Sequence, residues 1–317
     1  MRQRKTRARA RASETSTSAA PAVTRTSAIW RDTPAVSHRT AGLWPVALAS
    51  HDEGVIIGPG RPGSSSRSTD EESFRRLVDG AVRHPPRGWD FSFLSGRVVT
   101  QPLPWDYVEL ARQGVRRSGR VLDVDTGGGE VLAAIAPPSG SIAVEPYLPN
   151  VPVATETLTP YGVEVRIRQE RSRPVEDGEV DLVLNRHGAF DAQEAFRVLR
   201  PGGRFVSQQV GSRNDVEINE ALGAPLQDGD ALVSAAAMTE VANAAGFDVE
   251  RSEEAWPTTD YLDVGALVLQ LRTVSWQVPG FDAEMHRADL ERIHRHVVEH
   301  GSFRVTNHRL LLVARRR

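Results

Sequence analysis

A glycine-rich stretch carries the clearest chemical signal in the chain. It reads VLDVDTGGGE from Val121 to Glu130 and runs directly into the helical pattern VLAAI. Glycine lets a ligand lie against bare backbone, and a helix start offers N–H groups and partial positive charge to a carboxylate or phosphate. The stretch therefore predicts a ligand-binding loop, with a tight strand-to-helix connection as the alternative.

An acidic residue further along favours the ligand-binding interpretation. Glu145 ends the apolar run SIAV and follows the glycines at a spacing close to the roughly 20 residues seen in dinucleotide-type folds. In such folds the acidic side chain accepts hydrogen bonds from ribose hydroxyls. An isolated glutamate would be a solvated loop residue, but at this spacing Glu145 is predicted to bind a ribose.

The elements that must position these residues alternate between strand and helix. Strands are predicted at 120–125, 141–144, 163–167, 180–184 and 203–208, with a helix at 105–115 before them and helical stretches between most of them. This alternation favours a parallel, doubly wound sheet with helices on both faces. Helices are then predicted at 231–245, 261–274 and 283–300, and strands at 247–251 and 303–315.

Composition narrows the class of protein. The chain has 317 residues, of which 39% are hydrophobic, so it can build a proper core. Its formal net charge of -2 gives no overall basic field for nucleic acid, and the absence of cysteine excludes disulfides and cysteine-ligated zinc. No apolar run approaches the roughly 20 residues of a membrane helix, which predicts a soluble, cytoplasmic protein without a membrane partner.

The first 70 residues differ from the rest in composition and in hydrophobic pattern. They lack periodicity, are rich in Arg, Ala, Ser, Thr, Pro and Gly, and begin with the basic run MRQRKTRARARAS. A transit peptide, a nucleic-acid arm and a misassigned start are possible interpretations, but a segment that buries so little is predicted to be a disordered extension. The folded domain is predicted at 71–317.

The motifs together resemble the class I S-adenosylmethionine-dependent methyltransferases. The resemblance covers roughly 89–315 and includes VLDVDTGGGE, AVEPYLPN, VEDGEVDLVLNRHGAF and FRVLRPGGRFVSQQVG, whose LRPGG turn is a family marker that nicotinamide dehydrogenases lack. It implies a Rossmann-like, seven-stranded sheet, mostly parallel with an antiparallel last strand. It also implies S-adenosyl-L-methionine as the cofactor.

The resemblance assigns cofactor contacts residue by residue. It implies that Asp123 and the glycine loop hold the amino-acid end, that Glu145 holds the ribose, and that adenine lies near Gln169 or Glu170. Asp125 stands where the first loop glycine is usual, so a side chain occupies a place where backbone should approach the ligand. Gln169 replaces the acidic residue usual after the third strand. The implied cofactor residues are Asp123, Asp125, Thr126, Gly127, Gly128, Gly129, Glu145, Pro146, Gln169, Glu170 and Asn185.

The methyl acceptor is expected beside Asn185, Arg186 and His187, because open α/β sheets bind ligands beyond the carboxyl ends of their strands. Methyl transfer needs in-line positioning and a group that removes a proton. His187 is the candidate base and the other two are candidate contacts, although a lone loop histidine is more often structural. Gln208 and Gln209 could offer amides, with one of them facing the core.

Other aromatic and histidine residues leave alternatives open. Trp105, Asp106 and Tyr107 could cover the cofactor or could simply pack an amphipathic helix, which is favoured. His296 and His300 lie four apart on one helical face, a geometry able to hold a metal, but a solvated face is favoured and no metal site is predicted. The insertion at 256–301 is expected to wall the acceptor pocket, through Trp256, Tyr261, Trp276 and Phe281.

The leading hypothesis is methyl transfer to an oxygen or nitrogen of a small molecule. The late strand NHRLLLVARR and the segment DVGALVLQLRTVSW are also similar to ribosomal RNA guanine methyltransferases, so RNA is the second candidate acceptor. A basic face formed by Arg166, Arg168, Arg171 and Arg173 would favour it. A cofactor-binding but inactive partner protein is the third hypothesis and a nicotinamide oxidoreductase the least favoured. The oligomeric state is left open.

Overall fold

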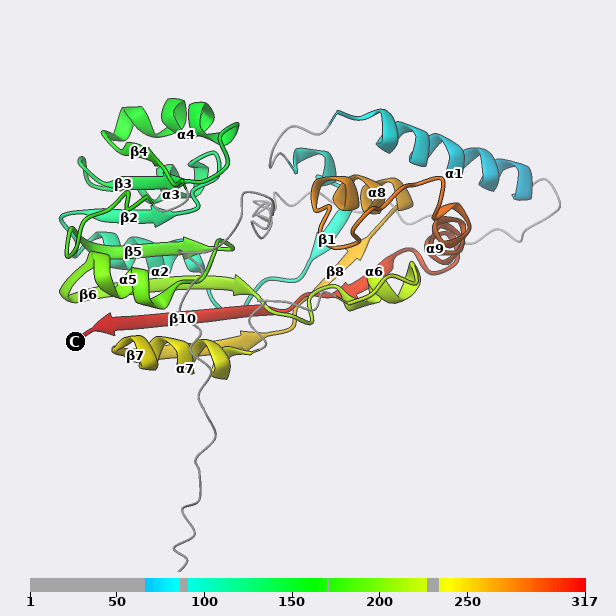
Figure 1. Ribbon diagram of the computed structural model, residues 1–317. Coiled ribbons are helices and arrows are strands. Elements are labelled where there is room, and N and C mark those ends of the chain that lie inside the picture. The colour runs from blue at the N-terminus through cyan, green and yellow to red at the C-terminus, as the bar shows by residue number, and fades with distance from the viewer. Residues whose placement is uncertain (1–65, 86–90, 170–171, 227–233) are drawn as a thin grey trace, which may run out of the picture.

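A computed structural model of the chain describes residues 66–85, 91–169, 172–226 and 234–317 (Figure 1). The predicted disordered extension lies outside the described residues except for 66–70, and so do Glu170 and Arg171. Among the described residues, every helix is too short or too polar to cross a bilayer.

A seven-stranded sheet forms the larger body of the molecule. Its strands follow the order β4 (Glu164–Ile167), β3 (Ile142–Glu145), β2 (Val121–Val124), β5 (Val180–Arg186), β6 (Leu199–Val210), β10 (Arg309–Arg316) and β7 (Phe247–Ala255). Strands β2 to β6 pair in parallel, and β10 is antiparallel to both of its neighbours. The predicted mostly parallel sheet with an antiparallel last strand is confirmed.

Helices cover both faces of this sheet because its central strands are apolar on both sides. On one face α2 (Tyr107–Val115), α3 (Glu130–Ile135) and α4 (Asn150–Leu158) pack against Val121, Leu182 and Val206. On the other face α5 (Ala192–Val198) and α7 (Ala235–Ala245) pack against Leu122, Val183 and Phe205. Successive strand residues point to opposite faces, so each strand contributes to both cores.

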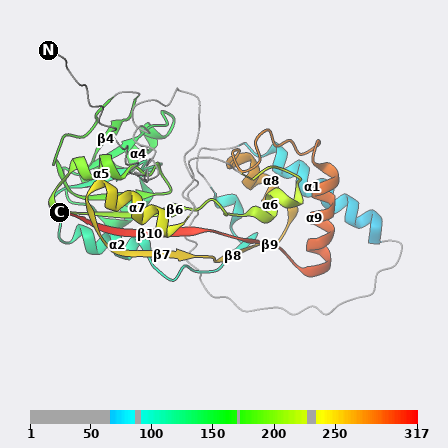
Figure 2. The ribbon, with the colours of Figure 1, turned by 60° about the horizontal axis from the view of Figure 1, so that its bottom comes forward.

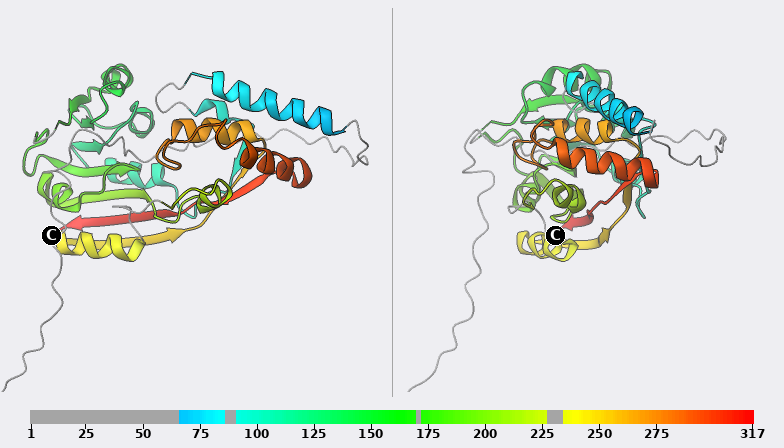
Figure 3. Two further views of the ribbon diagram at one scale, coloured as in Figure 1. Left: turned by 45° about the vertical axis from the view of Figure 1, so that its right-hand side comes forward. Right: turned by 90° about the vertical axis from the view of Figure 1, so that its right-hand side faces the viewer.

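A second, helical lobe lies beyond the carboxyl ends of the parallel strands, where the arrowheads of β5 and β6 point in Figure 1. It contains α1 (Ser66–Arg83), the 3₁₀ turn η1 (Ser92–Leu94), α6 (Val216–Ala221), α8 (Val264–Thr273) and α9 (Arg287–His300). These elements share one apolar core that includes Phe74, Ile218, Leu267 and Leu290. Figure 3 shows α1, α8 and α9 packed together on one side of the lobe. The lobe thus draws on segments well outside the insertion at 256–301.

A small antiparallel sheet joins the lobe to the larger body and was not predicted. It pairs β1 (Val98–Thr100), β8 (Thr258–Tyr261) and β9 (Phe303–Thr306). The predicted strand 303–315 is therefore wrong as a single element, because it divides at 307–308 between two sheets. The predicted helix 261–274 starts at Val264 instead, where Asp263 accepts a hydrogen bond from the N–H of Ala266. Figure 2 shows β10 and β7 running between the two bodies.

Candidate functional site

The glycine loop lies at the carboxyl end of β2, as predicted. Asp125, Gly127 and Gly129 have φ values of 58°, 64° and 84°, so the backbone turns through the left-handed region three times in five residues. A side chain at Gly129 would place its Cβ 2.7 Å from Leu158 Cγ, which makes glycine necessary there for packing as well. The Thr126 hydroxyl closes the turn by donating to Asp123 Oδ2 over 2.6 Å.

Glu145 ends β3 directly beside this loop and is only 2% exposed. Its Oε2 accepts from the N–H of Gly127 at 2.7 Å and its Oε1 from the N–H of Tyr147 at 2.8 Å. A carboxylate has about four lone-pair positions, so each oxygen keeps one for a further donor. Burial raises the pKa of Glu145 to about 7, with Asp125 also raising this pKa and Arg168 lowering it.

Asp123 faces the helix that begins at Tyr107. Burial raises the pKa of Asp123 to about 7, against the opposing effect of the Thr126 hydrogen bond. The Arg186 guanidinium lies over the Tyr107 ring, 6.0 Å from its centroid, and burial lowers the pKa of Arg186. The side chains of three residues therefore lie close together at the carboxyl ends of β2 and β5: Asp123, Tyr107 and Arg186.

Asp125 does not project into the loop as expected for a bulky replacement of glycine. Its carboxyl group is 3% exposed and lies along the sheet edge, where Oδ1 is 3.1 Å from Arg168 Nη2 and Oδ2 accepts from the N–H of Ala189 at 2.8 Å. A Cβ on Gly188 would lie 2.7 Å from Asp125 Cβ, so a glycine opposite makes room for the aspartate. The side chain therefore connects the loops that follow β2, β4 and β5.

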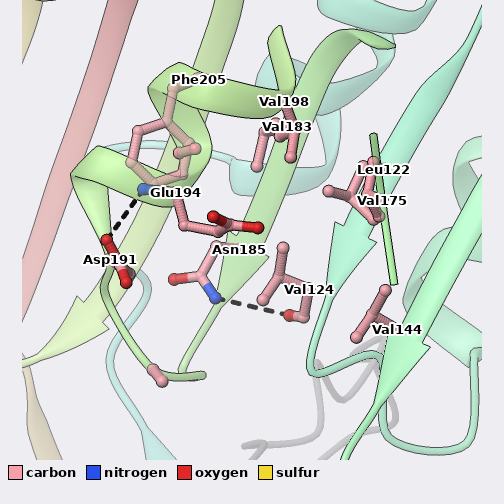
Figure 4. Close-up of a pocket in the computed structure, with 12 residues that line it drawn as sticks. Leu122, Val124, Val144, Val175, Val183, Asn185, Asp191, Glu194, Val198 and Phe205 are labelled. Atoms are coloured by element: carbon pink, nitrogen blue, oxygen red, sulfur yellow. Dashed lines mark hydrogen bonds between the residues drawn. The ribbon is translucent and has the colours of Figure 1, made fainter. Parts of the chain in front are cut away.

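Asn185 is held inside the protein by β6. Its amide nitrogen donates to the carbonyl of Val124 at 3.4 Å, and its oxygen accepts from the Ser207 hydroxyl at 3.2 Å and from Gln209 Nε2. Figure 4 shows Asn185 among the side chains that line a cavity between the sheet and α5. The cavity measures about 20 Å³, enough for one water molecule. Asn185 is thus a buried side chain that links β5 to β2 and β6 beneath the loops, and it is not exposed at the sheet edge.

His187 is 1% exposed and belongs to a hydrogen-bonded chain. Trp105 Nε1 donates to Gln208 Oε1 at 2.8 Å, and Gln208 Nε2 lies 2.9 Å from His187 Nε2. Indole nitrogen only donates, so the Gln208 oxygen faces Trp105 and its amide group donates to His187. His187 Nε2 is therefore the acceptor and the neutral ring carries its hydrogen on Nδ1.

The residues flanking this chain confirm a helix start. Asp106 caps α2 by accepting from the N–H of Glu109 at 3.0 Å, and the buried Tyr107 is the first residue of that helix. The predicted helix 105–115 therefore begins at Tyr107, which packs as the amphipathic-helix interpretation expects, whereas Trp105 precedes the helix; both also contact predicted site residues.

Other predicted residues lie apart from this cluster. Gln169 is exposed and its N–H bonds to Ser172 Oγ, and Pro146 is half-buried beside Glu145. Arg166 pairs with Glu164 and Glu179, and Arg173 is exposed. His296 and His300 stack with ring centroids 4.3 Å apart, and no group of three potential metal ligands occurs among the described residues.

The four predicted acceptor-pocket aromatics separate in the structure. Trp256 is 44% exposed and stacks on His308 with centroids 3.9 Å apart, while Trp276 and Phe281 pack against the lobe core. Tyr261, at the end of β8, is buried where the lobe and the sheet meet.

At this place the structure shows a largely buried polar group of which the sequence had indicated only Tyr261, and which we name the junction cluster: Asn214, Asp215, Tyr261, Asn307 and Arg309. Asp215 accepts from Asn214 Nδ2 at 2.8 Å and from Asn307 Nδ2. Arg309 donates to Asn214 Oδ1 and, at 3.0 Å, to the carbonyl of His308. The polar triplet NHR, which interrupts an apolar strand pattern, was the available signal.

Comparison with solved structures identifies the architecture. A candidate methyltransferase from Bacillus halodurans superposes with a TM-score of 0.50 and 20% identity, over 66% of this chain and 98% of that one. The chain has the Rossmann-like fold of methyltransferases. YcgJ from Bacillus subtilis matches with a TM-score of 0.47 and 16% identity over 67% of this chain and 98% of its own. Geranyl diphosphate methyltransferase, solved with S-adenosylmethionine, matches with a TM-score of 0.42 and 15% identity over 75% of this chain and 95% of its own.

No family profile and no curated protein matches the sequence. The seven-stranded sheet and the antiparallel β10 are the features that the resemblance to class I methyltransferases implies, and both are present.

Proposed function

We propose that the protein is an S-adenosylmethionine-dependent methyltransferase that acts on an oxygen or nitrogen of a small molecule. The observation that carries this proposal is Glu145, whose buried carboxylate ends β3 against the N–H of Gly127 and keeps lone pairs for two ribose hydroxyls. This is the acceptor geometry that an adenosyl group needs beside a glycine loop.

The residues at the sheet edge fit the cofactor. Glu145 would hold the ribose, and Asp123 with the loop 127–129 would hold the amino-acid end. When bound, the cofactor supplies an electrophilic methyl group. Transfer of that group would need an acceptor heteroatom held in line beside the carboxyl ends of β2 and β5, and a group there that takes up the acceptor's proton.

His187 can take that proton only after a rearrangement. Its Nε2 accepts from the Gln208 amide, so protonation there requires the amide to turn and to give up the bond from Trp105. In the observed arrangement His187 holds β5 and β6 in register at the edge, since its N–H also donates to the Gln208 carbonyl at 2.8 Å.

The predicted basic face favours a small acceptor over RNA, because two of its arginines are paired with carboxylates. Arg166 and Arg168 are both engaged with carboxylates, by contacts of 2.7 Å to Glu164 and 3.1 Å to Asp125. Guanidiniums paired in this way offer less charge to a phosphate backbone.

Titration calorimetry with S-adenosylmethionine and S-adenosylhomocysteine tests the proposal. Wild type is expected to bind both, and Glu145→Gln is expected to bind about tenfold or more weakly, because it loses a charged acceptor for ribose hydroxyls. Glu156→Gln, on the exposed side of α4, is the matched control. Folded wild-type protein that binds neither compound, or Glu145→Gln with unchanged affinity, would refute the cofactor site.

A further inference from the structure

Three segments that connect the larger sheet with the lobe and the small sheet meet at His308. Residues 211–215 link β6 to α6, residues 256–257 link β7 to β8, and residues 307–308 link β9 to β10. His308 is 0% exposed, its ring stacks on Trp256 with the centroids 3.9 Å apart, and a Cβ on Gly211 would collide with its Nδ1. The ring is therefore enclosed by the other two connecting segments.

The loop 211–214 is bound to residue 308 by three hydrogen bonds. The N–H of Gly211 donates to the His308 carbonyl at 3.0 Å, and the N–H of His308 donates to Asn214 Oδ1 at 3.0 Å. The N–H of Arg213 donates to His308 Nδ1 at 3.3 Å. A backbone N–H only donates, so Nδ1 is the acceptor and the neutral ring carries its hydrogen on Nε2, which donates to Glu254 Oε1 at 3.0 Å.

A second proton on the ring would change the interaction at Nδ1. Protonated Nδ1 is a donor and would face the N–H of Arg213, so this hydrogen bond would be lost and the two N–H groups would repel each other. Glu254 would keep its bond to Nε2 and, with the face of Trp256, favours the charged ring. The bond that protonation removes is therefore the one that binds the loop to the ring.

The charged groups around the ring come from β7, β10 and the loop. Burial lowers the pKa of His308 most, Glu254 on β7 raises it, and Arg309 and Arg213 lower it, with a lowered pKa as the net effect. Release of the loop therefore becomes easier as the pH falls below about 6.5, the ordinary pKa of histidine.

Asp215, which follows the loop, also titrates in this range. It interacts with Arg309, and burial raises its pKa to about 6. A carboxyl group with a raised pKa stabilises the folded arrangement as the pH falls, which is opposite in sign to the effect of His308. The two contributions are separated by a variant that removes only the titration of His308.

We propose that His308 is a pH-sensitive switch between the sheet and the lobe: the neutral ring binds the loop 211–214, and the protonated ring releases it. Release also weakens the junction cluster, because Asn214 in this loop binds Asp215 and Arg309. The lobe then moves more freely relative to the carboxyl ends of the parallel strands, where open α/β sheets bind their ligands. The inference goes beyond the proposed function and does not depend on any ligand.

Hydrogen exchange of the Arg213 amide in the full chain tests this switch, with each rate divided by the intrinsic rate at the same pH. Wild type is compared with His308→Asn, whose side-chain oxygen can accept from the Arg213 N–H but does not titrate. Between pH 7.5 and pH 5.5, protection should fall in wild type relative to the variant by up to about tenfold, because the released ring titrates near pH 6.5 while the bound ring stays neutral. The contribution of Asp215 is common to both proteins and cancels.

His300→Asn, at the exposed end of α9, is the matched control and should keep the pH dependence of wild type. The amides of β5 serve as an internal reference and should show no such difference between the proteins. Nitrogen NMR of the His308 ring adds a measurement that needs no variant. Nδ1 should carry no hydrogen at pH 7.5, and its protonation should coincide with the loss of protection at Arg213.

Three results would overturn the inference: the same pH dependence in wild type and His308→Asn, a hydrogen on Nδ1 at pH 7.5, or protonation of Nδ1 without loss of protection at Arg213. If His308→Asn does not fold, the two NMR results on wild type decide the question.

Discussion

The affinity for the cofactor should follow the charge of Glu145. A ribose hydroxyl donates more strongly to a carboxylate than to a carboxylic acid, and the pKa of Glu145 is raised by burial to about 7. The free protein therefore holds a proton on Glu145 below pH 7 that cofactor binding must displace. Affinity for S-adenosylhomocysteine should be constant above about pH 8 and should fall by up to about tenfold per pH unit well below pH 7.

Arg168 is expected to control the pKa of Glu145, and with it the pH below which affinity for the cofactor falls. It lowers the pKa of Glu145, and its own N–H donates to the Glu145 carbonyl at 3.2 Å, which places it beside the acid. Arg168→Gln also leaves Asp125 without its ion pair, so both changes raise the pKa of Glu145. If the rise is about one unit, the ionised fraction at pH 7 falls from about one half to about one tenth. Affinity at pH 7 should then fall about fivefold.

Calorimetric titrations of S-adenosylhomocysteine between pH 6 and pH 9 check this prediction, with Arg173→Gln as a control from the exposed part of the same loop. The pKa of Asp123 lies in the same range and is also raised by Asp125, so Arg168→Gln acts on Asp123 only through Asp125 but on Glu145 both directly and through Asp125. The curves of wild type and Arg168→Gln should converge at high pH. An equal loss of affinity at pH 6.5 and pH 9 would show that Arg168 acts only through structure and would refute the reasoning.

Three further predictions concern the sheet edge. Gly188→Ala should destabilise the fold by about 1–3 kcal/mol in urea unfolding, because its Cβ would lie 2.7 Å from Asp125 Cβ; a change within experimental error would contradict this packing. Asp125→Gly should lower stability by a similar amount, about 1–3 kcal/mol, by leaving the N–H of Ala189 without its acceptor, whereas a large gain in cofactor affinity would show that Asp125 obstructs the site. Trp105→Phe should free the Gln208 amide to turn, so nitrogen NMR of the His187 ring should change from one tautomer to a mixture; an unchanged single tautomer would refute the assigned chain.

Much of the fold could be predicted because its signals are local. The central strands are short β-branched runs buried on both faces, and the helices between them have their own periodicity. The small sheet of β1, β8 and β9 escaped prediction because its strands are three or four residues long and pair with partners far away in sequence. Its stability depends on those pairings rather than on local preference.

The candidate site shows the same division. The glycine loop and Glu145 were recognisable because backbone freedom and a carboxylate at a set spacing leave a direct mark in the sequence. The direction of Asp125 could not be inferred, since it depends on Arg168 and on the missing side chain at Gly188, which reach it from other loops. Likewise, nothing local reveals that Gln208 fixes the tautomer of His187.

The sequence by itself determined the order of the central strands and the helices between them, the ligand loop and the acid beside it, because each depends on neighbours within a few residues or on a regular spacing. Only the tertiary structure decided which polar side chains meet. Asp215, Tyr261 and Arg309 come from three separate segments, and their burial where these segments meet shifts the pKa of each. Burial and long-range proximity are properties of the folded chain, and no single segment contains them.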